Sequence, residues 1–274
     1  MLFGGETAES YYEEGLTSSI KGDYEQALVF FHKALSLNPV FAAAHHQIAK
    51  THIRLGAFQK AIDALNQAVA LMGRKTSALA DLAQAYYLLG KVKEARTIFS
   101  EILQISEKDT RGVLGLAFCA FADEQWVTAI NLVQHASTLG RLHFDAHFLI
   151  ARAAAKTGAE DIAGFHFQQA LEQMNHTLEI TEEQVTGYFL RGLVHASMGG
   201  LLDALRDMDS ALRYIDPDKN YFAYNHFFNK VEILVQKGVL LKDLNRIREA
   251  KETGEQILAL APDNQTGMML ASLS

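Results

Sequence analysis

The sequence is poor in residues that cross-link or interrupt a fold. Its 274 residues include one cysteine, Cys119, so no disulfide can form within the chain, which suits a reducing compartment. Only three prolines occur, and the many alanine, leucine and glutamine residues favour helix over sheet. The sequence therefore predicts a mainly helical, cytoplasmic protein.

Positive charge and long apolar runs are also scarce. Lys and Arg number 25 against 32 Asp and Glu, a formal net charge of −7, which argues against a general basic face for nucleic acid. No apolar run approaches the ~20 residues that a membrane-spanning helix needs, and the first residues show no secretory signal. We expect no nucleic-acid partner and no direct insertion into a membrane.

Patterns that carry catalysis or bind metals are missing as well. The sequence shows no phosphate-binding glycine loop, no nucleophile elbow and no paired metal-binding motif. His45 and His46 would project about 100° apart on a helix, and no cysteine or carboxylate completes a ligand set with them. Cys119 lies in an apolar segment, which indicates a buried, inert thiol. We predict no enzymatic activity, no cofactor and no metal.

What the sequence does contain is a repeat. The segment Ala8–Phe41 carries two apolar-periodic stretches, which predict two helices separated by Gly22, a residue that can end a helix in the left-handed conformation. Asp23 would cap the second helix, and Pro39 would end it. The small residue of the first helix recurs every 34 positions, at Gly15, Ala49, Ala83, Ala117 and Ala151.

A period near 34 is typical of helical hairpins that bury their apolar faces only by stacking. The order of large, small, aromatic and paired alanine positions, followed by proline, resembles the tetratricopeptide repeat (TPR) family. The resemblance implies an all-α fold, a right-handed α-solenoid of stacked antiparallel helix pairs, with about seven TPR units in a single domain over residues 1–274. The expected repeats are 8–41, 42–75, 76–109, 110–143, 144–177, 185–218 and a degenerate 224–264.

The regularity breaks in three places. Glu124 stands where other repeats have the turn glycine, which predicts a different type of turn. A surplus of seven residues precedes the sixth repeat, where Thr181 and Gln184 predict a capping box. In the degenerate repeat we expect Phe227 on the first helix, Gly238 at the turn between the helices, and about seven inserted residues after it.

Residues 265–274 form a short apolar tail, in which Met268 and Ser272 occupy positions of a first helix. TPR arrays usually finish with a polar helix that covers the last repeat. Three interpretations stay open: the tail is a minimal cap, it docks on a partner, or it begins an eighth repeat of a longer chain.

In the TPR family the first helices line a concave groove and the second helices face outward. Carried over repeat by repeat, the groove positions fall on aromatic, apolar, polar and basic residues. The candidate peptide-binding residues are Tyr12, His46, Lys50, Arg54, Gln84, Tyr87, Leu114, Phe118, Phe121, Phe148, Arg152, Lys156 and Phe189, with Leu16 and Leu193 beside them.

Two basic pairs stand out in this set. Lys50 with Arg54, and Arg152 with Lys156, are four residues apart, so each pair lies on one face of a helix. Such a groove suits a peptide with acidic groups and one or two apolar anchors. The alternative is that the charges are solvated or paired with neighbours and that aromatic residues such as Phe118 belong to the core. The Lys–Asn pair of the family's carboxylate clamp is missing, which argues against a chaperone C-terminal tail as the ligand.

The sequence thus predicts a protein–protein interaction scaffold that binds a peptide or helix of a partner in its concave groove. A self-assembling scaffold, in which the C-terminal tail docks on another copy, is one alternative. An interaction arm of a longer chain, with an effector domain beyond Ser274, is another. A related helical-hairpin class binds single-stranded RNA, but the net charge and the alanine pattern argue against it.

Overall fold

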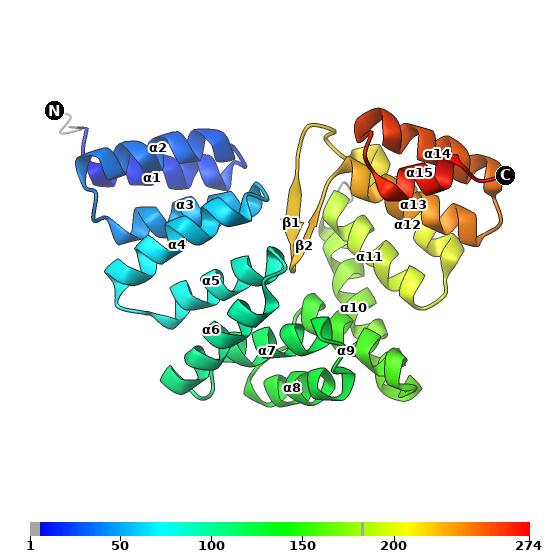
Figure 1. Cartoon of the computed structure of the whole chain (residues 1–274), viewed down its shortest axis with the longest axis horizontal. Helices are drawn as coiled ribbons and strands as arrows, with labels where there is room; N and C mark the ends of the chain where they lie inside the picture. The colour runs from blue at the N-terminus through cyan, green and yellow to red at the C-terminus, as the bar shows by residue number, and fades with distance from the viewer. Residues whose placement is uncertain (1–5, 182–183) are drawn as a thin grey trace. The chain divides into compact units, whose positions relative to one another are not determined.

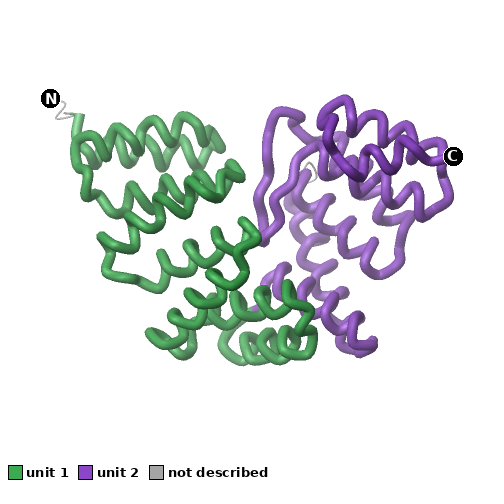
Figure 2. The backbone as a smooth tube through the Cα atoms, in the orientation of Figure 1, with its two compact units in different colours: residues 1–141 green, residues 142–274 purple. Residues whose placement is uncertain are grey.

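The computed structural model describes residues 6–181 and 184–274 and shows stacked pairs of helices (Figure 1). This part of the chain contains fifteen helices and one two-stranded antiparallel hairpin, which confirms the predicted fold class. The residues form two compact units, 1–141 and 142–274, called unit 1 and unit 2 below (Figure 2). The single domain over residues 1–274 stays a prediction.

In its described residues, unit 1 consists of four helical hairpins. The first helices are α1 (Ala8–Ile20), α3 (Ala42–Arg54), α5 (Thr76–Leu88) and α7 (Thr110–Ala122). The second helices are α2 (Tyr24–Leu37), α4 (Phe58–Met72), α6 (Val92–Ile105) and α8 (Trp126–Leu139). Each of α2, α4 and α6 packs on its own first helix and on the first helix that follows, so neighbouring repeats bury each other's apolar faces.

As far as it is described, unit 2 has three helical hairpins and a short last helix. The first helices are α9 (Phe144–Thr157), α11 (Val185–Ser197) and α13 (Lys230–Asp243). The second helices are α10 (Glu160–Ile180), α12 (Leu201–Tyr214) and α14 (Ile247–Leu260), and α15 (Gln265–Ala271) follows. The strands β1 (Tyr221–Ala223) and β2 (His226–Phe228) come between α12 and α13 and pair with Tyr221 opposite Phe228.

Small residues let the two helices of a hairpin approach closely. At Gly15 an added Cβ would lie 2.5 Å from Cε1 of Phe31, because the phenylalanine ring fills the space beside the glycine. The equivalent first-helix residues are all buried: Gly15, Ala49, Ala83, Ala117, Ala151, Gly192 and Gly238. The first five therefore occupy equivalent surroundings, as the 34-residue spacing predicts.

The turn between the two helices of a pair is the same in all seven described pairs. The residue seven positions after the small first-helix residue has a positive φ each time, from 57° to 82°. Its N–H donates to the carbonyl three residues back, and the next N–H donates to the carbonyl five residues before it, which is a Schellman motif. Five of these turn residues are glycines, and the others are Glu124 and Asn245. The prediction of a different turn at Glu124 is therefore wrong.

The seven surplus residues before the sixth repeat lengthen α10. This helix has 21 residues, whereas α2, α4 and α12 have 14 or 15. Thr181 is the C-cap of α10, and Gln184 is the N-cap of α11 without a side-chain cap hydrogen bond. The predicted capping box of Thr181 and Gln184 is therefore wrong; the two residues between them lie outside the described part of the chain.

The degenerate repeat also differs from its prediction. Gly238 lies within α13, not at a turn, and the turn falls at Asn245. No residues are inserted between Gly238 and Ala250, whose spacing of twelve equals that of Gly15 and Ala27. The extra length lies earlier, since Gly192 and Gly238 are 46 positions apart, twelve more than the period. It contains the β1–β2 hairpin, so Phe227 is on a strand rather than on a first helix.

Helix α15 covers the end of unit 2. Leu270 is fully buried against α13 and α14, and a Cβ on Gly238 would lie 2.4 Å from Cδ1 of Leu270. The Asn264 side chain caps α15 by accepting a hydrogen bond from the Gly267 N–H at 2.8 Å. Helix α15 thus packs on the last described helical hairpin of unit 2. A minimal cap and the start of an eighth repeat both stay predictions for this tail. Its docking on another copy stays a prediction.

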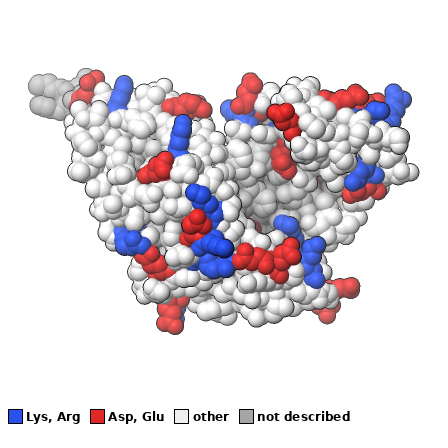
Figure 3. Space-filling view, in the orientation of Figure 1, with Lys and Arg blue, Asp and Glu red and all other residues white. Residues whose placement is uncertain are grey.

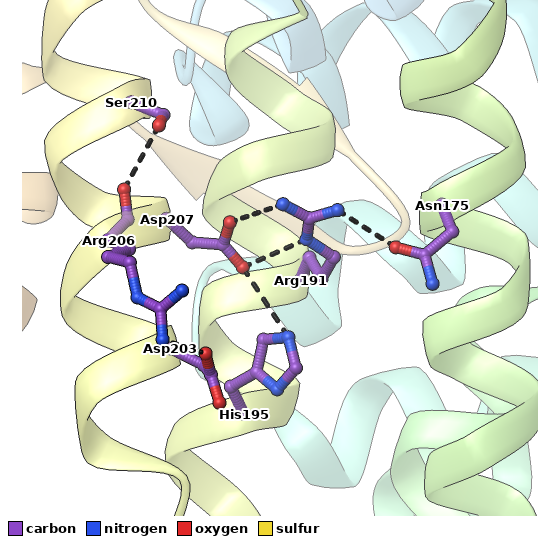
Figure 4. A network of polar contacts seen from close by, with 7 residues as sticks. All are labelled: Asn175, Arg191, His195, Asp203, Arg206, Asp207 and Ser210. Atoms are coloured by element: carbon purple, nitrogen blue, oxygen red, sulfur yellow. Dashed lines mark hydrogen bonds and ion pairs between the residues drawn. The ribbon is translucent and has the colours of Figure 1, made fainter.

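One interhelix contact in unit 2 is an ion pair. Arg191 on α11 donates from Nε and Nη2 to the two carboxylate oxygens of Asp207 on α12, at 2.9 and 2.6 Å (Figure 4). Nη1 donates to Asn175 on α10, and His195 Nε2 lies 3.7 Å from Asp207. The Asp207 side chain is only 5% exposed. This part of unit 2 therefore joins three helices through a buried carboxylate, a half-buried guanidinium and an exposed amide.

Charges of both signs are interspersed on the face of the molecule that Figure 3 shows. None of the helices in the described ranges combines the length and the apolar character that crossing a bilayer requires.

Candidate functional site

The candidate residues of unit 1 all lie on first helices. They are Tyr12 on α1, His46, Lys50 and Arg54 on α3, Gln84 and Tyr87 on α5, and Leu114, Phe118 and Phe121 on α7. The register of the repeat therefore places them on the same side of consecutive helical hairpins.

Neighbouring first helices of unit 1 are linked through these residues. His46 Nε2 lies 2.6 Å from Oδ2 of Asp81, which connects α3 with α5. The rings of Tyr87 and Phe118 meet edge to face with centroids 5.8 Å apart, which connects α5 with α7. The first-helix face of unit 1 thus carries a polar link followed by an aromatic pair.

Two of the candidate aromatic residues pack on other parts of their repeats. The Tyr12 ring lies 5.8 Å from the ring of Phe31 and 5.0 Å from that of Phe41. Phe121 meets Trp126, the first residue of α8, at 4.9 Å. These contacts stabilise the repeats, so packing accounts for both residues without a ligand.

The basic pair of unit 1 is open to solvent. Lys50 and Arg54 are both exposed on α3, in the same helix as His46, while Gln84 and Leu114 on the next two first helices are half-buried. A chain passing across α3, α5 and α7 would meet positive charge first and aromatic surface afterwards.

In unit 2 the candidate phenylalanines lie beneath the hairpin. Phe189 is 2% exposed, because Phe228 of β2 stacks on it with ring centroids 4.1 Å apart. Phe148 is 4% exposed, and the His226 ring lies 6.0 Å from it. From the sequence we expected both phenylalanines to line a concave groove, but the chain itself covers them. Their contact with a partner stays a prediction.

The tip of the hairpin contacts the start of α9. Tyr224 and Asn225 form its two-residue turn with φ values of 48° and 61°, and the Tyr224 ring lies 5.5 Å from Phe144. Asn225 Nδ2 donates to Oδ2 of Asp145 at 3.1 Å. Burial raises the pKa of the Asp145 carboxyl group, and hydrogen bonds from backbone N–H groups and from Asn225 oppose that rise.

A pocket of about 440 Å³ lies beside the hairpin. One side of it comes from four first-helix residues that the sequence singled out: Phe148, Arg152, Phe189 and Leu193. The Arg152 guanidinium lies 5.4 Å from the centre of the Phe148 ring, within cation–π range. Lys156, the remaining candidate, is exposed near the end of α9.

The other side of the pocket comes from residues that the sequence analysis missed, His226 and Phe227 of β2 and Glu232 and Gln236 of α13. His226 Nδ1 lies 2.7 Å from the Tyr224 carbonyl oxygen, which can only accept, so the hydrogen is assigned to Nδ1 and Nε2 is an acceptor. Burial lowers the pKa of His226, so its ring is neutral near pH 7. Gln236 Nε2 donates to Oε1 of Glu232 at 2.8 Å. The pocket thus combines aromatic walls with groups of both charges.

A signal for the hairpin existed in the sequence. The spacing of Gly192 and Gly238 exceeds the repeat by twelve residues, and the extra stretch has aromatic residues at Tyr221, Phe222, Tyr224 and further on. Placing Gly238 at a turn moved the surplus to the wrong side of this glycine and concealed the strands.

The buried thiol and the polar clusters offer little chemistry. Cys119 is fully buried, as predicted, and burial raises its pKa to about 11, so it stays protonated near neutral pH. Within residues 6–181 and 184–274, no three His, Cys, Asp or Glu side chains gather as metal ligands would.

Within each unit the helices are stacked in antiparallel pairs, which is the arrangement of an α-solenoid. Profiles of the tetratricopeptide repeat match residues 20–73, 54–117 and 231–264. The chain therefore carries repeats of the TPR family. TPR folds generally mediate protein–protein interaction.

Known proteins with a similar sequence or fold agree with this family. A TPR repeat-containing protein of Methanocaldococcus jannaschii is 22% identical over 253 residues, 92% of this chain and 36% of that protein. The chain thus spans about a third of the length of this curated relative. A tetratricopeptide repeat protein from Parabacteroides merdae has a TM-score of 0.60 at 14% identity, over 97% of this chain and 98% of that one. The APC/C hetero-tetramer Cut9-Hcn1 contains a chain with a TM-score of 0.63 at 18% identity, over 88% and 43%. These two likenesses concern the fold alone.

Proposed function

We propose that this chain is a protein–protein interaction scaffold whose unit 1 binds a peptide or helix of a partner on its first-helix face. The observation that carries the proposal is the order in which basic and aromatic surfaces follow one another on consecutive first helices. Lys50 and Arg54 are exposed on α3, and the Tyr87–Phe118 pair joins α5 to α7. A partner segment with acidic groups and one or two apolar anchors complements that order.

Unit 2 repeats part of this chemistry. Arg152 and Lys156 form a second basic pair on α9, and Arg152 lines the pocket beside the hairpin. The proposed role is binding without catalysis. The net charge of −7 favours a protein over a nucleic acid as the partner.

The test compares partners captured from cell extract by three full-length proteins, measured by quantitative mass spectrometry. The first is the wild type. The second removes the charged and aromatic side chains of the proposed face, with alanine at Lys50, Arg54, Tyr87 and Phe118. The third is a matched control that removes two exposed lysines and two exposed valines from second helices, with alanine at Val29, Lys60, Lys93 and Val127.

We expect the second protein to lose its partner at least tenfold while the control captures as much as the wild type. Because Tyr87 and Phe118 also pack on each other, a fourth protein with Lys50→Glu and Arg54→Glu leaves both rings in place and should lose the same partner. Equal capture by all four proteins would overturn the assignment of the binding face.

A further inference from the structure

The β1–β2 hairpin of unit 2 covers the kind of surface that unit 1 leaves open. Its residues contact first helices, with Tyr224 on Phe144 of α9 and Phe228 on Phe189 of α11. Figure 1 shows both strands beside α11. The hairpin belongs to the twelve residues by which this junction exceeds the repeat, so the helix stack does not need them for its register. We call Phe144, Asp145, Phe148 and Phe189 the hairpin-contact surface.

The hairpin-contact surface receives side chains two residues apart on one strand. The His226 ring lies 6.3 Å from Phe144 and 6.0 Å from Phe148, and Phe228 stacks on Phe189 at 4.1 Å. Side chains at positions i and i+2 of an extended chain point to the same side. The surface therefore suits an extended segment with two flat rings in that spacing.

A polar contact fixes the direction of such a segment. Asn225 immediately precedes His226, and its Nδ2 donates to Asp145 Oδ2 at 3.1 Å. Asn225 is a turn residue with φ of 61°, so its side chain is not bound by the alternation of the strand. An amide side chain on a residue in this conformation, just before the first ring, is thus the third feature that this surface recognises. Because the Asp145 carboxyl group is buried, leaving it without a hydrogen-bond donor would lower the stability of the protein. A donor at this position therefore contributes to binding.

The hairpin that supplies these groups is a small element. Each strand has three residues, and an isolated two-stranded hairpin is at best marginally stable in water. Its two-residue turn needs positive φ at both positions, for which Asn-Gly is favoured, yet here Tyr224 and Asn225 adopt it. Contact with α9 and α11, rather than the turn itself, therefore keeps the hairpin in place.

We propose that a segment of a partner protein can displace the hairpin from the hairpin-contact surface and bind there instead. This segment is extended and carries an amide residue, then an aromatic ring, and a second ring two positions after the first. This proposal rests on the proposed function in taking first helices as the binding face, but it concerns unit 2 and a different ligand. The experiment on unit 1 can therefore disprove its binding face without affecting the hairpin-contact surface. The experiment on the hairpin can likewise fail without affecting the proposal for unit 1.

The test uses the hairpin's own sequence as the probe. A fluorescein-labelled peptide with the sequence of residues 219–229 is titrated into two full-length proteins, the wild type and a variant with a Gly-Ser segment in place of residues 221–228. Fluorescence anisotropy reports binding, and circular dichroism reports whether the variant keeps its helices. A scrambled peptide and a peptide with Phe228→Ala serve as controls.

We expect the peptide to bind the Gly-Ser variant at least tenfold more tightly than the wild type, whose surface is occupied. The scrambled and Phe228→Ala peptides should bind the variant at least tenfold more weakly than the full sequence. A variant that keeps its helices but does not bind the peptide would overturn the proposal. Equal binding to wild type and variant would overturn it too, because the site would then not be covered.

A milder change decides the matter if the Gly-Ser variant does not fold. Asn225→Asp places a carboxylate against Asp145, whereas the matched Asn220→Asp adds the same charge at the base of the hairpin, where the side chain contacts Asn229. Hydrogen exchange of residues 221–228 should accelerate at least tenfold in Asn225→Asp alone, with α9 and α13 unchanged, and peptide binding should strengthen. Exchange as slow as in the wild type would refute an exchangeable hairpin.

Discussion

Units 1 and 2 are built from one repeat but depart from it to different extents. In unit 1 the small first-helix residues keep their spacing of 34, and the first-helix face carries exposed basic residues. In unit 2 seven extra residues lengthen α10, and twelve extra residues precede α13 and include the hairpin. The first addition extends the second helix of a pair and the second precedes the next first helix, so neither changes the turn that joins two paired helices. A solenoid can therefore gain a new surface without disturbing the contacts that hold each pair together.

The largest difference that can be tested is the contact between the paired helices. Unit 2 joins α11 and α12 through Arg191 and Asp207, whereas Ile48 and Ala64 occupy the equivalent positions in the second repeat of unit 1. Asp207→Ala removes the carboxylate from an arginine whose side chain is 24% exposed. We expect a loss of about 3–5 kcal/mol in the free energy of unfolding, measured by urea denaturation followed by circular dichroism.

The control for this experiment replaces both charges. Arg191→Met combined with Asp207→Leu gives these positions the apolar character that they have in the second, third and fourth repeats, and it should cost less than Asp207→Ala alone. If Asp207→Ala lowers the free energy of unfolding by less than about 1 kcal/mol, the ion pair does not hold the two helices together.

The second comparison concerns glycines on first helices. A Cβ at Gly115 in unit 1 would lie 2.2 Å from Cε1 of Phe99, which belongs to a stiff, buried ring. A Cβ at Gly192 in unit 2 would lie 2.7 Å from Cε of Met208, the flexible end of its side chain. We expect Gly115→Ala to cost about 1–3 kcal/mol and Gly192→Ala less than about 1 kcal/mol, by thermal and urea denaturation. Equal losses of stability in the two variants would mean that the Phe99 ring and the Met208 thioether move aside equally easily.

The regular part of the fold was accessible from the sequence because each repeat contacts only its neighbours. The spacing of Gly15, Ala49 and their equivalents fixed which faces pack and where the turns fall. Glu124 was misread because a residue other than glycine can adopt positive φ when the Schellman motif around it is complete. Gly238 was misread because glycine serves both at turns and at close helix contacts, and only the burial of Leu270 against it tells the two apart.

The candidate site was predictable only in part. The repeat register placed Phe148, Arg152 and Phe189 on first helices, and all three line the pocket of unit 2. The wall formed by His226 and Glu232 depends on how an irregular insertion folds back, and a 34-residue period carries no information about that. Local patterns of sequence describe stacked repeats well and describe additions to them poorly.

The third comparison concerns the dependence of stability on pH, because unit 2 contains two histidines that face each other. His147 Nδ1 and His166 Nδ1 are 2.8 Å apart, a distance that requires one donor and one acceptor. Burial, together with the charge of His147, lowers the pKa of His166 to about 4. In the unfolded chain a histidine titrates near pH ~6.5, so the unfolded state binds more protons between about pH 6.5 and 4. The contribution of His166 to the stability of unit 2 should therefore be fully present above this window and be lost as the pH falls through it.

We expect a loss of about 1 kcal/mol between pH 7 and pH 5, after allowance for the partial exposure of His166. His166→Leu installs the residue that Leu132 provides at the equivalent position of unit 1, and it should remove this part of the pH dependence. Urea denaturation at both pH values measures the effect. His226 and His52 also have lowered pKa values through burial, so some dependence should persist in the variant. If the free energy of unfolding of His166→Leu changed with pH as steeply as that of the wild type, the histidine pair would not be the source of the pH dependence.

The smallest expected effect compares the two turns that lack glycine. Glu124 in unit 1 has φ 58°, and Asn245 in unit 2 has φ 57°, in the same Schellman motif. The left-handed conformation costs most side chains about 1–2 kcal/mol, but asparagine adopts it more readily. Glycine removes this cost and adds freedom to the unfolded chain, which offsets part of the gain.

Glu124→Gly should therefore stabilise the protein by about 0.5–1 kcal/mol, and Asn245→Gly by a few tenths at most, roughly. Thermal denaturation monitored by calorimetry can resolve this difference, with Gly90→Ala as the reverse change at a turn where open space leaves only the φ of 79° to oppose a side chain. If Glu124→Gly were destabilising, contacts of the glutamate side chain rather than backbone conformation would govern that turn. Conformation would then no longer explain why five of the seven described turns carry glycine.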